Sequence, residues 1–221
     1  MYNLVLKDML HLKRYLLMSP LIVVFAMAAL HNMSGVVLTA STVAIAYTSM
    51  IQACMRDDKN GSDLMLNSLP LRRRDIVLAK YFSIFVYVGV GFVSYVVVWA
   101  IMRELGMEVS KTSLMGLVGT LASVVVLSSV YFPLYFKLGY AKSNMFGTLM
   151  FFLYFFGQSL VIRLARDLVA RTELGDRLST LVAWVNGMSA WLAPLLLLLL
   201  VFVVMFVSYR FSLRFYGSRE F

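Results

Sequence analysis

The chain contains little of what catalytic and metal-binding sites require. Its 221 residues include one cysteine, Cys54, which excludes an internal disulfide. The two histidines, His11 and His31, do not belong to a cluster of ligands at metal-binding spacing. A Gly-x-x-x-x-Gly-Lys-Ser/Thr loop does not occur, so this chain does not cradle nucleotide phosphates by that route. We therefore expect no metal, no cofactor and no catalytic residue in the chain itself.

Charged residues are also scarce. They make up 14% of the sequence, whereas hydrophobic residues make up 61% and the mean hydropathy is +0.83. A soluble domain of this size could not hide that much apolar surface from water. The charges are clustered, and the stretches between the clusters are long enough to cross a bilayer. The sequence therefore predicts an all-α membrane protein with a single transmembrane domain over residues 1–221.

We expect six transmembrane helices. They occupy residues 15–33, 36–55, 81–102, 112–132, 145–162 and 191–208. Residues 1–14 place apolar and polar side chains on opposite helical faces, which predicts an amphipathic helix on the membrane surface. Residues 56–80 form a cytoplasmic connector that is too charged to enter lipid. Residues 163–186 form an outer segment in which charged and apolar residues alternate.

The distribution of basic residues predicts the orientation. One side of the membrane would hold both termini and the connectors after the second and fourth spans, and it carries 14 of the 20 Lys and Arg residues. By the positive-inside rule this side is cytoplasmic. The net charge of +9 therefore reflects orientation and anionic headgroups, and we expect no nucleic-acid partner.

The predicted spans lack ionisable side chains, apart from His31 at the outer edge of the first span. Proton relays, voltage sensors and intramembrane hydrolases need ionisable groups at membrane depth. The sequence therefore disfavours a proton-coupled carrier, a membrane protease and an ion channel acting alone.

The connector at residues 56–80 reads RDDKNGSDLMLNSLPLRRRDIVLAK. Asn60 and Gly61 suit a turn, Ser62 or Asp63 can cap a short helix, and Pro70 ends that helix before a basic run. One interpretation is that the basic run only holds the connector against anionic lipid. The other is that the short helix docks a cytoplasmic partner. The residues alone leave both interpretations open.

The ordered pattern of this connector resembles the first cytoplasmic loop of ABC-transporter permeases of the type-two exporter class. Within that class it is most similar to the compact bacterial group with six spans and a separately encoded ATPase. The matching residues are Asp57, Asp58, Asn60, Gly61, Ser68, Leu69, Pro70, Arg73, Ile76 and Lys80. A second resemblance lies at residues 132–142, FPLYFKLGYAK, and corresponds to the cytoplasmic end of that group's fourth span.

The resemblance implies the permease subunit of an ATP-driven exporter in a bacterial plasma membrane. Two such chains, identical or related, would pack around a central path above two cytoplasmic ATP-binding subunits, which would bind ATP and Mg. Each subunit would grip a coupling helix at about residues 62–69, with an apolar contact from Leu64, Met65 and Leu66. A second cytoplasmic contact would come from Lys137, Gly139, Tyr140 and Lys142.

The sequence leaves alternatives open for the cargo, for the structure of the outer segment and for the class of function. The apolar and aromatic spans suit an amphipathic or hydrophobic cargo such as a peptide, an antibiotic or a lipid-like molecule, although lipid-facing aromatics have the same sequence character. In the family, the segment before the last span forms outer re-entrant helices, whereas two ordinary surface helices fit residues 163–186 equally well. A second class of function is a membrane-bound immunity or sensor protein that docks a cytoplasmic partner without transport.

Overall fold

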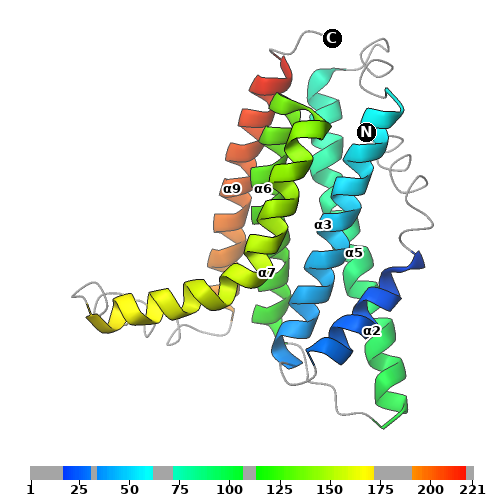
Figure 1. The fold of residues 1–221 in the computed structure, drawn as a ribbon, viewed down its shortest axis with the longest axis vertical. Coiled ribbons are helices and arrows are strands. Elements are labelled where there is room, and N and C mark those ends of the chain that lie inside the picture. The colour runs from blue at the N-terminus through cyan, green and yellow to red at the C-terminus, as the bar shows by residue number, and fades with distance from the viewer. Residues whose placement is uncertain (1–16, 31–33, 62–71, 107–112, 172–190, 218–221) are drawn as a thin grey trace.

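The computed structural model describes residues 17–30, 34–61, 72–106, 113–171 and 191–217. Within these ranges every regular element is an α-helix, which confirms the all-α prediction (Figure 1). The helices are α2 (Ser19–Ala29), α3 (Ser34–Lys59), α5 (Arg73–Glu104), α6 (Leu114–Leu138), α7 (Tyr140–Arg171) and α9 (Leu192–Gly217). The predicted amphipathic helix at 1–14 and the predicted coupling helix at 62–69 lie outside the described residues.

Four of the described helices are long and apolar enough to cross a membrane, namely those at Val36–Lys59, Arg73–Glu104, Leu114–Leu138 and Leu192–Gly217. They stand side by side as a bundle, together with the first part of α7 (Figure 1). The shorter apolar helix α2 lies within the predicted first span and packs obliquely on α3 and α5. These features establish a multi-pass membrane protein.

Several helices continue past the predicted spans. Helix α5 begins at Arg73, before the expected start of its span at residue 81, because the intervening charged residues are still good helix formers. Helix α6 runs through Pro133 to Leu138, beyond the expected end at residue 132. Proline normally ends a helix, but helices in membrane proteins tolerate it where neighbouring groups satisfy the freed carbonyl. Helix α7 continues to Arg171, and its last part turns away from the bundle (Figure 1).

One end of the bundle gathers most of the described basic side chains, and we call it the basic end. Here α3 and α9 end, α5 begins, and α6 meets α7 (top of Figure 1). Its basic residues are Arg56, Lys59, Arg72, Arg73, Arg74, Lys80, Lys137, Lys142, Arg210 and Arg214. At the opposite end α5 finishes with Arg103 and Glu104.

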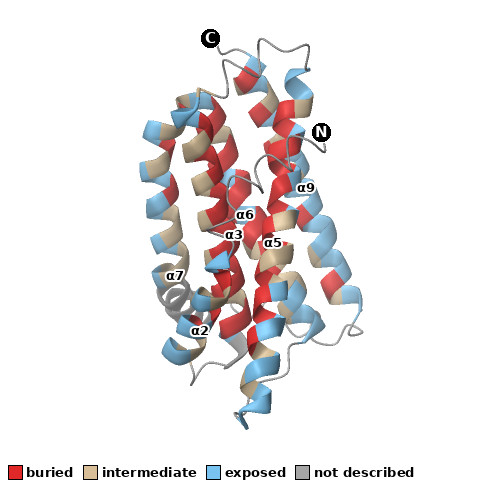
Figure 2. Ribbon diagram, turned by 90° about the vertical axis from the view of Figure 1, so that its right-hand side faces the viewer, coloured by how far each residue is buried: buried red, intermediate tan, exposed pale blue. Residues whose placement is uncertain are grey.

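Burial differs sharply from helix to helix. In the apolar stretch of α3 that is long enough to cross a membrane, 67% is buried inside the protein. The corresponding share for α9 is 17% (Figure 2). Helix α3 is thus the centre of the bundle, and the exposed leucines, valines and phenylalanines of α9 lie on its outside. Lipid is as apolar as these side chains, so helices are held together by close packing and hydrogen bonds rather than by hydrophobic burial.

Hydroxyl groups provide some of these bonds. The Ser19 and Ser94 Oγ atoms lie 2.7 Å apart and join α2 to α5. The Thr39 and Thr120 Oγ1 atoms lie 3.0 Å apart and join α3 to α6. Tyr47, which is fully buried, donates a 3.0 Å hydrogen bond to the carbonyl oxygen of Gly147 and joins α3 to α7.

Gly147 also allows α7 to pack closely against α6. A Cβ atom added there would lie 2.7 Å from Tyr131 Cε2 and 2.9 Å from Tyr131 Cδ2, closer than real Cβ contacts. The Tyr131 ring is fully buried and stacks against Tyr135, so it has little room to retreat. Gly147 therefore fixes how near α7 comes to α6.

We expect Gly147→Ala to lower the thermal midpoint of the detergent-solubilised protein, because overpacking costs about 1–3 kcal/mol. The matched control is Gly89→Ala in α5, where an added Cβ would meet nothing within 4 Å. That control gains helix propensity and should leave the midpoint unchanged or raise it. Equal behaviour of the two variants, measured by circular dichroism, would contradict the packing argument.

Candidate coupling site at the basic end

An ion pair joins α3 to α5 where the predicted coupling segment leaves the bundle. Lys80 Nζ donates to Asp57 Oδ2, and the two side chains are only 11% and 7% exposed. Buried charges are tolerated when they are paired, and removing one partner leaves an uncompensated charge. The last turn of α3 and the second turn of α5 are therefore held against each other.

The start of α5 is also tied to the end of α9. Arg73 Nη1 donates to the carbonyl oxygen of Gly217 at 2.8 Å and reaches the carbonyl oxygen of Tyr216 at 3.5 Å. The last carbonyls of a helix have no partner within the helix, and a cation there also complements the helix dipole. Arg73 thus caps α9 from a neighbouring helix. Sequence reasoning missed Tyr216 and Gly217, because no motif marks the acceptor of such a bond.

Helix α6 joins the same cluster through aromatic contacts. Tyr216 is fully buried and meets Phe136 edge-on, with ring centroids 5.2 Å apart. The Lys137 ammonium lies 5.3 Å from the centroid of the Phe215 ring, a cation–π geometry. Lys137, expected in a cytoplasmic contact, therefore sits beside the end of α9.

A chain of hydroxyls lies deeper in the bundle. Ser208 Oγ donates to the carbonyl oxygen of Ser129 at 2.6 Å, which uses its only proton. Tyr81 OH lies 2.6 Å from Ser208 Oγ and 2.9 Å from Ser212 Oγ, so it donates to Ser208 and accepts from Ser212. These bonds link α5, α6 and α9 just inside the Arg73 contact.

The connection between α6 and α7 is a single residue, Gly139. Its φ of 77° and ψ of 174° belong to a region that is essentially restricted to glycine. Its N–H donates to the Tyr135 carbonyl at 2.9 Å, and its own carbonyl accepts from the Ser143 N–H at 3.2 Å. The sequence predicted a longer connector between residues 132 and 145. The helices instead meet directly at the glycine.

The two segments that the sequence singled out meet at this end. Tyr140, the first residue of α7, packs against the main core, and the pKa of its phenol is raised by burial and by the nearby Cys54 and Asp58. Asp58 is exposed near the end of α3, and Lys142 is exposed on α7. Asp58 from the first segment therefore acts electrostatically on Tyr140 from the second.

The remaining predicted site residues divide into two groups. Asn60 and Gly61 form the turn that ends α3, with the Asn60 N–H bonded to the Arg56 carbonyl at 2.9 Å and Gly61 at a φ of 58°. The others lie outside the described residues, and they are Leu64, Met65, Leu66, Ser68, Leu69 and Pro70. Among the described residues, no three His, Cys, Asp or Glu side chains gather as a metal site.

The lipid-facing helices and the paired charges of the basic end define a helical, multi-pass membrane protein. A family model described as ABC-2 family transporter protein matches residues 3–217, and the chain belongs to this family. A search of curated proteins and a search of solved structures found no match. The chain is thus the permease subunit of an ABC transporter. Family membership makes it a non-catalytic subunit and implies a partner subunit that binds ATP.

We expect the Asp57–Lys80 pair to behave as one unit. Lys80→Met or Asp57→Leu alone should lower the free energy of unfolding, by up to about 3–5 kcal/mol, since each removes one member of a buried ion pair. The double variant should recover most of that loss. Denaturant titration in mixed micelles measures the effect, with the exposed Asp58→Ala as a near-neutral control. Additive losses in the double variant would show that the two residues act separately.

Gly139→Ala should destabilise the corner between α6 and α7 by about 1–3 kcal/mol, because alanine is strained at this φ and ψ. Gly119→Ala in the second turn of α6 is the matched control, since an added Cβ there meets nothing within 4 Å. Thermal unfolding of both variants tests the difference. A Gly139→Ala protein as stable as the control would mean that the corner relaxes at no cost.

Proposed function

We propose that this chain is the membrane-spanning subunit of an ATP-driven exporter in a bacterial plasma membrane. It pairs with a second permease chain, identical or related, above two ATP-binding subunits that hydrolyse ATP with Mg. The basic end faces the cytoplasm, where both termini also lie. The gathering of basic side chains at that end supports this orientation.

The observation that carries the proposal is the anchoring of both ends of the predicted coupling segment. Residues 62–71 leave α3 just after Asp57 and enter α5 at Arg73, and these two residues hold the flanking helices to their neighbours. The helices on both sides of this segment are therefore held to their neighbours. A force applied to the segment by an ATP-binding subunit would be passed to the anchored ends of α3 and α5.

The same contacts spread the force through the bundle. Arg73 links α5 to α9, and the Tyr81 and Ser208 hydroxyls link both helices to α6. Shifting two states from 1:99 to 99:1 requires about 5.5 kcal/mol of differential binding. Nucleotide binding can deliver that free energy to the spans only if the connection is stiff. Lys137 and Lys142, on either side of the rigid Gly139 corner, provide a second contact for the ATP-binding subunit.

The cargo in this proposal is amphipathic or hydrophobic, such as a peptide, an antibiotic or a lipid-like molecule. The spans carry apolar and aromatic side chains, and α7 exposes Phe152 and Phe156 toward the surroundings of the bundle. Such a surface offers dispersion and aromatic contacts rather than charge recognition. Movement of cargo depends on the ATP-binding subunit, because the predicted spans contain no Asp, Glu, Lys or Arg, and their one histidine, His31, lies at an outer edge.

The test is ATP hydrolysis by the ATP-binding subunit that co-purifies with this chain, measured with and without the chain in lipid. We expect the chain to change the hydrolysis rate. Replacing Leu64, Met65 and Leu66 together with Ser should abolish that change without preventing insertion. Leu105→Ser, an exposed apolar-to-serine change at the opposite end, should leave it intact. The absence of an associated ATPase, or a coupling variant that behaves as wild type, would overturn the proposal and favour a membrane-bound immunity or sensor protein.

A further inference from the structure

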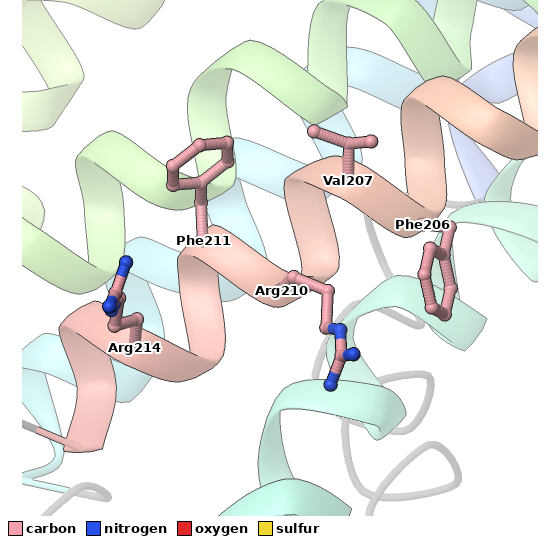
Figure 3. A pocket seen from close by; sticks show the side chains of 5 residues that line it. All are labelled: Phe206, Val207, Arg210, Phe211 and Arg214. Atoms are coloured by element: carbon pink, nitrogen blue, oxygen red, sulfur yellow. The ribbon is translucent and has the colours of Figure 1, made fainter.

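The exposed side of α9 carries a hollow near the basic end. It has a volume of about 420 Å³ and lies along one stripe of the helix (Figure 3). Phe206, Val207 and Phe211 supply its apolar lining, and Arg210 and Arg214 supply two guanidinium groups one helical turn apart. The Arg210 guanidinium lies 5.5 Å from the centroid of the Phe206 ring. All five side chains are exposed, so the hollow opens to the surroundings of the bundle.

The position of the hollow places its two halves in different layers of the bilayer. Helix α9 begins at Leu192, and Arg210 lies about 27 Å further along its axis at 1.5 Å per residue. The hydrocarbon core is about 30 Å thick. Arg210 therefore reaches the edge of the hydrocarbon, Arg214 lies roughly 6 Å further out among the headgroups, and Phe206 and Val207 remain in the acyl layer.

The charges around the hollow favour an anion. The lining of the hollow contains two arginines, Arg210 and Arg214, and no carboxylate among the described residues. Arg73 is occupied by the end of α9, whereas Arg210 and Arg214 project from the exposed face. Guanidinium groups bind phosphate oxygens through paired hydrogen bonds.

We propose that this stripe of α9 binds an anionic phospholipid from the leaflet on the basic side. The lipid phosphate sits between Arg210 and Arg214, and one acyl chain lies over Phe206, Val207 and Phe211. A zwitterionic lipid fits less well, because its choline group brings a positive charge to a site that is already positive. The site belongs to this chain alone and does not depend on the proposed export cycle.

The test is native mass spectrometry of the purified chain, titrated with phosphatidylglycerol or with phosphatidylcholine of the same acyl length. Wild type should retain phosphatidylglycerol preferentially. The double variant Arg210→Gln, Arg214→Gln should bind it roughly thirty-fold more weakly, because each basic residue near an anionic surface contributes about a factor of five. Glycerol phosphate, which has no acyl chain, should fail to displace the lipid.

The matched control is Arg103→Gln at the opposite end of the bundle. Arg103 is also exposed and also lies 5.5 Å from an aromatic centroid, that of Trp99, but it belongs to α5 and is not part of the hollow on α9. It should bind phosphatidylglycerol as wild type does, and the charge-preserving variant Arg210→Lys, Arg214→Lys should keep most of the preference. Equal binding of both lipids by wild type, an equal loss in the Arg103 control, or displacement by glycerol phosphate would overturn the inference. Because no ATPase is present, failure here is distinct from failure of the coupling experiment.

Discussion

The arrangement of the basic end depends on a buried pair of opposite charges. Asp57 and Lys80 lie on different helices, and their ion pair offsets the cost of burying both charges away from water. Hydrophobic burial cannot set the register of two helices in lipid, since the surrounding solvent is equally apolar. A buried charge pair can set the register, because sliding either helix by one turn would separate the two partners. The pair thus fixes α3 against α5, and the Arg73 contact ties α5 to the end of α9.

The hydrogen bonds between hydroxyl groups of different helices contribute less free energy than the ion pair. Bonds of this kind average about 0.6 kcal/mol in membrane proteins, whereas breaking a buried ion pair costs about 3–5 kcal/mol. Ser19 with Ser94 and Thr39 with Thr120 therefore guide packing without locking it. They lie away from the basic end, because Ser19 belongs to α2 and Thr39 is near the start of α3, whose other end is the basic end. The helices are thus held firmly where the predicted coupling segment attaches and more loosely beyond it, which is the distribution of stiffness that a driven conformational change requires.

Sequence reasoning succeeded where a single segment carries the signal. Charge-free apolar stretches predicted the described spans, and the Asn60–Gly61 turn appears where its residues predict it. It placed Asp57, Lys80 and Arg73 in one functional segment but could not pair them, because a pair across two helices depends on their rotation about their axes. It also ended the fourth span before Pro133, since the local rule for proline ignores the environment that tolerates it. The Tyr216 and Gly217 carbonyls were missed because backbone acceptors leave no trace in residue type.

The corner at Gly139 limits how the two helices that it joins can move. A one-residue connection holds the adjoining ends of α6 and α7 at a fixed height, so α7 cannot ratchet along α6 by a 5.4 Å turn. What remains is rotation about the corner as a pivot. Helix α6 is about 37 Å long, and a change of roughly 10° in the angle between the two axes would separate their far ends by about 6 Å. A small change of angle at the corner, near one membrane face, therefore becomes a displacement of several ångströms at the other face.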